Sequence, residues 1–151
     1  TELLPSEIIE LFELRALVES HVLEKAIDNM TEQDLQKASE IVQAFDEAVE
    51  SGTRIETWSD LNYSLHAALY SPAKMPQAME VIHTLNIKSD RYIRLQLLLT
   101  SSVDKAEAEH KELVELCRKG DKTGACELLR SHIREAGLAI HDLLVEQQQG
   151  K

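Results

Sequence analysis

The segment VDKAEAEHKELVELCRKGDKTGACELLRSHIREA, residues 103–136, decides the fold of this chain. Apolar residues recur every three or four positions on both sides of a break at Gly120-Asp121, which is the spacing of two amphipathic helices. Gly is typical of the position just after a helix, and Asp is typical of the position that starts the next one. The segment therefore predicts two antiparallel helices joined by a tight turn.

Four further segments show the same helical period. Their expected bounds are about 6–29, 31–51, 55–70 and 76–100. The last two are separated by SPAKMP, in which two prolines interrupt any continuous helix. No alternation of apolar and polar residues competes with the helical signal. We expect an all-α fold, a single antiparallel helical bundle of six to seven helices that spans residues 1–151 as one domain.

The composition argues against several classes of protein. The chain has 151 residues, with 16 Lys and Arg against 27 Asp and Glu, and a formal net charge of −11. This charge repels a phosphate backbone, so the chain by itself is not expected to bind DNA. No stretch of 18 apolar residues is present, so we expect no membrane partner. Cys117 and Cys126 lack CxxC spacing, which favours reduced core thiols in a cytoplasmic protein.

Two histidines of the terminal helices are expected to face each other in the core. His110 lies 10 residues before Gly120 and His132 lies 11 after Asp121, which places both roughly 15–17 Å from the turn at about 1.5 Å per residue. Each also lies on the apolar stripe of its helix. An unpaired buried polar group costs on the order of 1–3 kcal/mol, so buried imidazoles need partners. A shared metal ion is one such partner.

The third expected helix offers further metal ligands. Asn62 and His66 are four residues apart, so their side chains project from neighbouring turns and can converge on one point. Asp60 is the stronger ligand by chemistry, but it points roughly 120° away from His66 around the helix. We therefore prefer Asn62 and keep Asp60 as the alternative. Each histidine could instead be a core residue that is hydrogen-bonded to a backbone carbonyl.

Arginines provide candidate anion contacts. Arg15 stands in the middle of the inward stripe of the first expected helix, where a guanidinium needs an anion. Glu19, four residues on, can supply that anion within the helix, or the fork of Arg15 can bind the carboxylate of a ligand. Arg91 and Arg94 in the fourth expected helix are further candidates for effector binding, although a solvated face is the simpler interpretation.

Several short motifs occur in an order that resembles a known family. They are Glu13-Leu14-Arg15 with Glu19, Asn62 four residues before His66, Glu109-His110 with Gly120-Asp121 beyond it, and Ser131-His132. They resemble the effector-binding domain, called the FCD domain, of the FadR-type branch of GntR transcription regulators. The resemblance covers nearly the whole chain.

The resemblance implies both a fold and a site. It implies an all-helical bundle that forms a homodimer, binds a small organic acid and controls an amino-terminal winged-helix DNA reader. It also implies one divalent metal ion per chain, most often zinc or nickel, with Arg15 near the effector carboxylate. The residues that match the family's metal ligands are Asn62, His66, His110 and His132.

The sequence also departs from the family pattern. Asn62 stands where Asp is frequent, which removes one negative charge and should weaken metal affinity or change metal preference. The segment SPAKMPQAM lacks the Asn-Pro-Leu pattern of the family. The winged-helix domain is absent from this chain, and we interpret the start TELLPSEIIE, which has no initiator Met, as a cut end. We therefore expect DNA contact only through the missing amino-terminal domain.

The leading hypothesis is a metal-dependent organic acid sensing and dimerisation domain of a bacterial transcription regulator, with no enzymatic activity. The alternatives are a helical-bundle metalloenzyme with a three-His site, as in DinB-like bundles, and a plain dimerisation module. Glu109 and Asp60 are each expected to point away from their neighbouring ligand, which leaves no clear general base for catalysis.

Overall fold

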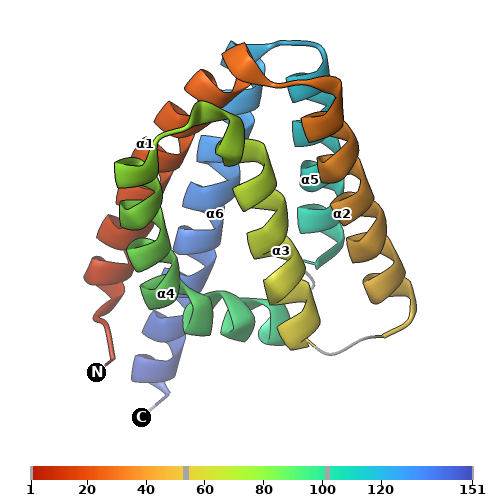
Figure 1. Cartoon of the computed structure of the whole chain (residues 1–151). Coiled ribbons are helices and arrows are strands. Elements are labelled where there is room, and N and C mark those ends of the chain that lie inside the picture. The colour runs from red at the N-terminus through yellow and green to blue at the C-terminus, as the bar shows by residue number, and fades with distance from the viewer. Residues whose placement is uncertain (1, 53–54, 101–102, 151) are drawn as a thin grey trace.

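The computed structural model describes residues 2–52, 55–100 and 103–150, which form a bundle of helices (Figure 1). The elements are α1 (Pro5–Asn29), α2 (Glu32–Glu50), α3 (Ile55–Tyr70), a 3-10 turn η1 (Ser71–Ala73), α4 (Pro76–Leu99), α5 (Val103–Arg118) and α6 (Lys122–Gln149). No strand occurs in these described ranges. The expected all-α fold is confirmed.

Local signals explain where the helices begin and end. The Thr31 hydroxyl accepts a hydrogen bond from the Asp34 backbone N–H at 3.2 Å, and the Asp34 carboxylate accepts one from the Thr31 N–H at 2.8 Å, so α2 begins with a capping box. Gly120 follows α5 with φ of 71°, a conformation that favours glycine. Asp121 then caps α6 by accepting from the Gly124 N–H at 3.0 Å.

The core is built on α1 and α6, which pack against each other more extensively than any other pair of helices (Figure 1). Gly137 on α6 permits this approach, because a Cβ added there would lie 2.6 Å from Phe12 Cβ on α1. On the other side of the bundle, α2 packs against α3 and α5. Cys117 and Cys126 are buried without a disulfide, as expected for core thiols.

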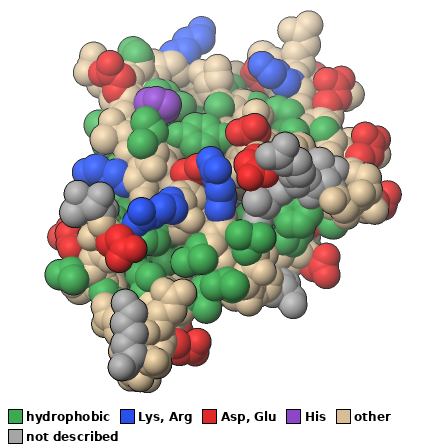
Figure 2. Space-filling model, turned by 90° about the horizontal axis from the view of Figure 1, so that it is seen from below, with side chains coloured by type: hydrophobic (Ala, Val, Ile, Leu, Met, Phe, Trp, Pro, Cys, Tyr) green, Lys and Arg blue, Asp and Glu red, His purple; other side chains and the backbone are tan. Residues whose placement is uncertain are grey.

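Helix α4 bends, and its last turns run across the lower end of the bundle (Figure 1). In its middle, the Ser89 hydroxyl donates a hydrogen bond to the Leu85 carbonyl at 2.7 Å, and such a bond favours bending of a helix. Seen from below, apolar, acidic and basic side chains are interspersed (Figure 2). None of the helices in the described ranges is long and apolar enough to cross a membrane.

Candidate metal and effector site

Three histidines from three helices meet inside the bundle. His66 lies on α3, His110 on α5 and His132 on α6, and one ligand nitrogen from each lies within 4.8 Å of the other two. The ring centroids of His110 and His132 are 5.4 Å apart, which confirms that the two histidines lie level across the terminal hairpin. His66 lies 5.8 Å from His110 by the same measure. The three imidazoles therefore surround one common point.

Two of these imidazoles, those of His66 and His110, have the protonation state that a metal needs. Burial lowers the pKa of His110 to about 3, with a further contribution from His132. Burial also lowers the pKa of His66 well below its usual value, and His110, His132 and Arg15 add to the shift. His66 Nε2 and both ring nitrogens of His110 are buried without a hydrogen-bond partner among the described residues. Neutral imidazoles with unused nitrogens are a chemically suitable donor set for a divalent ion.

Two carboxylates lie behind two of these histidines. Glu109 Oε1 is 3.3 Å from His132 Nδ1, and Glu19 Oε1 is 3.8 Å from His66 Nδ1. The contact with His132 is the main cause of a lowered pKa for Glu109. Carboxylates in this position orient metal-binding imidazoles in many proteins. The sequence placed Glu109 away from its neighbour His110, and the structure adds that its carboxylate reaches His132 on α6.

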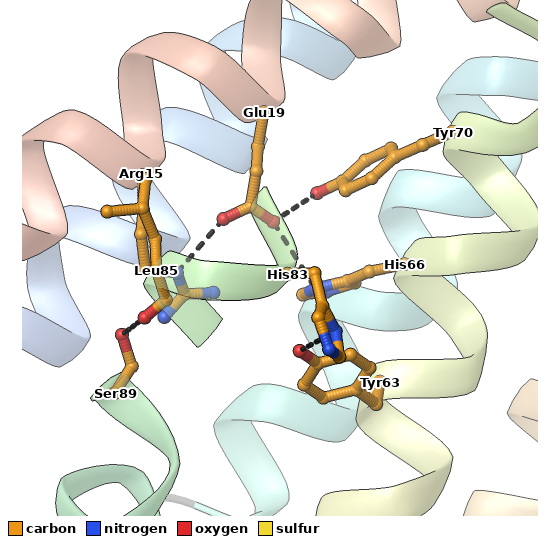
Figure 3. A network of polar contacts seen from close by, with 8 residues as sticks. All are labelled: Arg15, Glu19, Tyr63, His66, Tyr70, His83, Leu85 and Ser89. Atoms are coloured by element: carbon orange, nitrogen blue, oxygen red, sulfur yellow. Dashed lines mark hydrogen bonds and ion pairs between the residues drawn. The ribbon is translucent and has the colours of Figure 1, made fainter. Parts of the chain in front are cut away.

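Arg15 and Glu19 form a buried pair on α1, with 3% and 0% of their surfaces exposed. Arg15 Nε donates to Glu19 Oε2 at 2.9 Å, and the Tyr70 hydroxyl donates to Glu19 Oε1 at 2.8 Å (Figure 3). The guanidinium carbon also lies 5.1 Å from the centre of the Phe12 ring. Within the described part of the chain, the terminal nitrogens of Arg15 make no hydrogen bond.

A cavity of about 260 Å³ connects Arg15 with the histidine cluster. Its polar lining includes Asn62, Glu109 and Gln96. Much of the remaining wall is apolar and is formed by Phe45, Trp58, Ile93, Leu97, Ala106, Ala136 and Ala139. An ion pair between Lys105 and Glu135 also contributes to the lining. The volume and the mixed lining suit a small ligand with a polar head.

The other predicted site residues lie in different places. Asn62 lines both this cavity and a small pocket beside Arg15, whereas Asp60 is exposed and lines neither. Arg94 pairs with Asp90, and Arg91 donates to the Tyr92 hydroxyl at 2.7 Å. Neither Arg91 nor Arg94 lines the cavity, so the structure does not bring them to the effector position that the sequence suggested.

Sequence reasoning missed two further residues of the site. Tyr70 is buried and holds Glu19, and Gln96 is buried and lines the cavity. Tyr70 lies four residues after His66 on α3, so its position on the same helix face was a usable signal. Gln96 belongs to the bent end of α4, and no sequence signal indicated that this segment would reach the cavity.

Comparison with known families gives one match, and it covers most of the chain. The model described as the FCD domain matches residues 10–135. A search of curated proteins finds no match.

Solved structures share the fold at low sequence identity. A GntR-family transcriptional regulator from Pseudomonas syringae pv. tomato DC3000 superposes with a TM-score of 0.79 at 22% identity, over 97% of this chain and 60% of that protein. Escherichia coli McbR/YncC gives 0.78 at 22% identity, over 89% and 67%. Lar, which controls expression of the Listeria monocytogenes agr system and mediates virulence, gives 0.79 at 15% identity, over 93% and 66%. This chain therefore spans about three-fifths of the first regulator.

Proposed function

The chain belongs to the FCD domain family, and from this premise we propose that it is the metal-dependent, carboxylate-sensing domain of a GntR-type transcription regulator. Membership in the family makes it a regulatory domain rather than an enzyme. The metal and the class of effector rest on the chemistry of the cavity, and the assembly of the regulator rests on the net charge of the chain and on symmetry.

One observation carries the metal part of the proposal: three buried imidazoles offer ligand nitrogens within 4.8 Å of one another, and at least two of the rings have nitrogens without partners. His66, His110 and His132 would hold one divalent ion, zinc or nickel, with the Asn62 amide oxygen as the fourth ligand. The ion would supply a positive point charge and an open coordination position. Glu109 and Glu19 would fix the rings behind it.

The charges of the site favour an anion only once a metal is bound. Arg15 contributes one positive charge, and Glu19 and Glu109 contribute two negative charges, while Lys105 and Glu135 neutralise each other. With neutral imidazoles the total is about −1, which repels an anion, and a divalent ion changes it to about +1. A small monocarboxylate would then neutralise the site.

The planar guanidinium of Arg15 suits the carboxylate because its terminal nitrogens can form two parallel charge-assisted hydrogen bonds. The small apolar side chains of Ala106, Ala136 and Ala139 leave room for a short hydrocarbon tail. The proposed effector is therefore a small organic acid.

The acidic domain is proposed to act on DNA through a partner domain. A net charge of −11 disfavours direct contact with phosphates, and basic side chains on the face in Figure 2 are interspersed with acidic ones. A winged-helix domain outside this chain would read DNA in the bacterial cytoplasm. A symmetric homodimer would place two such readers on two half-sites.

Metal analysis of purified variants tests the proposal. We expect one divalent ion per chain in the wild type and a large loss of metal in His110→Ala, because one of three imidazole ligands is removed. His21→Ala serves as the matched control, because His21 is exposed and lies outside the cluster. Wild-type metal content in His110→Ala would contradict the assignment.

A further inference from the structure

We infer that Glu19 is a positioning residue that links the two halves of this site, because its carboxylate is hydrogen-bonded to Arg15, which would bind the acid, and faces His66, which would bind the metal. The inference rests on the proposed function and adds a coupling between the two ligands. Figure 3 shows Glu19 between Arg15 on one side and His66 with Tyr70 on the other.

Both oxygens of Glu19 are engaged. Oε2 accepts from Arg15 Nε at 2.9 Å, and Oε1 accepts from the Tyr70 hydroxyl at 2.8 Å while lying 3.8 Å from His66 Nδ1. The side chain is fully buried, so water does not compete for these oxygens. Glu19 is therefore anchored by helix α3 through Tyr70 while it holds a side chain of its own helix.

The contact with Glu19 leaves the terminal nitrogens of the Arg15 guanidinium available for a ligand. Glu19 uses the Nε edge, and within the described residues the two terminal nitrogens have no hydrogen-bond partner. Arg15 lines the cavity, so its two terminal nitrogens can bind a ligand carboxylate through two hydrogen bonds. Without Glu19, the guanidinium loses the contact that sets its direction.

The contact with His66 determines which nitrogen can bind a metal. The Nδ1 side of His66 faces Glu19, and Nε2 is the buried nitrogen without a partner. At 3.8 Å the carboxylate is too far for a hydrogen bond, but its negative charge favours the tautomer with the proton on Nδ1, which leaves the Nε2 lone pair for the metal. Glu19 thus orients a metal ligand and the acid-binding arginine with a single carboxylate.

Glu109 provides a matched control within the same cluster. Its Oε1 lies 3.3 Å from His132 Nδ1, so it stands behind an imidazole as Glu19 does. Glu109 makes no hydrogen bond or ion pair with Arg15 in the described structure. Loss of Glu109 should therefore weaken metal binding. Once the metal is saturating, it should not weaken binding of the acid, because it removes a negative charge without releasing Arg15.

The substitution Glu19→Gln separates positioning from simple electrostatics. Electrostatics alone predicts tighter binding of an anion, because a negative charge near the site is removed. Positioning predicts weaker binding, because Arg15 and His66 are no longer aligned. The two explanations therefore predict changes of opposite sign in the affinity for the acid.

Calorimetry with zinc and butyrate makes the test. We expect Glu19→Gln and Glu109→Gln each to lose about 10- to 100-fold in zinc affinity, as is typical when a residue that supports a metal-binding imidazole is replaced. At saturating zinc, butyrate affinity should fall about tenfold in Glu19→Gln, whereas Glu109→Gln, which removes the same charge without releasing Arg15, should bind butyrate at least as tightly as the wild type. Unchanged or tighter butyrate binding in Glu19→Gln would overturn the inference and leave the proposed function intact.

Two other results distinguish a failure of the proposed carboxylate binding from a failure of the coupling through Glu19. A zinc-loaded wild type that binds no butyrate would overturn the carboxylate part of the proposed function, and the coupling with it. Nitrogen-15 NMR of the zinc-loaded wild type tests the coupling without any variant. We expect His66 to bind zinc through Nε2 and to show a slowly exchanging Nδ1–H. Zinc bound at His66 Nδ1 would overturn the inference even if Glu19→Gln fails to fold.

Discussion

The histidine cluster has two unlike sides. On the α1 side, Arg15, Glu19 and Tyr70 are buried and hydrogen-bonded to one another. On the side of the α5–α6 hairpin, the Glu109 and His132 side chains are 16% and 17% exposed. Buried charges must keep their partners, whereas partly exposed charges can be solvated. We therefore expect the α1 side to fix the geometry of the site and the hairpin side to adjust when a ligand enters.

The two sides should differ most in how much the free energy of unfolding falls when the carboxylate of each side is removed. Glu19→Ala leaves the Arg15 guanidinium buried and unpaired, so it should destabilise the metal-free protein by about 3–5 kcal/mol. Glu109→Ala removes a partly exposed partner and should cost about 1 kcal/mol or less. Urea unfolding of both variants measures the difference. Equal losses would show that the two sides are energetically alike.

Acid should destabilise the metal-free protein through the buried imidazoles. Because the folded pKa of His110 is about 3, the unfolded chain binds more protons between pH 3 and about 6.5, and the free energy of unfolding falls as the pH falls through this window. From pH 7 to pH 5 the loss attributable to His110 is about 2 kcal/mol.

The variant His110→Leu sharpens this prediction. It removes the titrating group but keeps an apolar side chain in the core, so the metal-free variant should lose about 2 kcal/mol less than the wild type over the same pH range. His21→Leu, at an exposed position, is the control and should behave as the wild type. The same acid sensitivity in His110→Leu and the wild type would argue against a neutral, buried His110.

Replacement of the Arg15 guanidinium should have a smaller effect, which is confined to ligand binding. Arg15→Lys keeps the charge but loses the planar pair of donors, so butyrate binding to the zinc-loaded protein should weaken by about 1 kcal/mol or more. Arg94→Lys is the control, because Arg94 pairs with Asp90 outside the cavity. Zinc content should stay unchanged in both variants. Equal butyrate binding in Arg15→Lys and Arg94→Lys would remove Arg15 from the effector site.

Sequence reasoning predicted the features that depend on local structure. Helix ends follow from cap residues such as Thr31 and Gly120, whose interactions lie within a few positions. The level placement of His110 and His132 was also predictable, because a tight turn between two helices allows residues to be counted from it.

Features that depend on how separate helices rotate against each other were not predictable. Glu109 reaches His132 across two helices, and Tyr70 reaches Glu19 across another pair. The bend of α4 also changes which residues face inward, so Gln96 lines the cavity and Arg94 does not. A helical wheel represents one straight, isolated helix, so it contains no information on contacts between helices or on bends.

We propose above that the three-histidine centre binds a divalent ion and that a small carboxylate needs this ion. Calorimetry of butyrate against metal-stripped and zinc-loaded wild-type protein tests it most directly. We expect binding near one molecule per chain with zinc and no measurable binding without it, because the net charge of the site changes from about −1 to about +1 when the ion enters. Equal binding of butyrate to the two forms would show that the carboxylate does not need the ion.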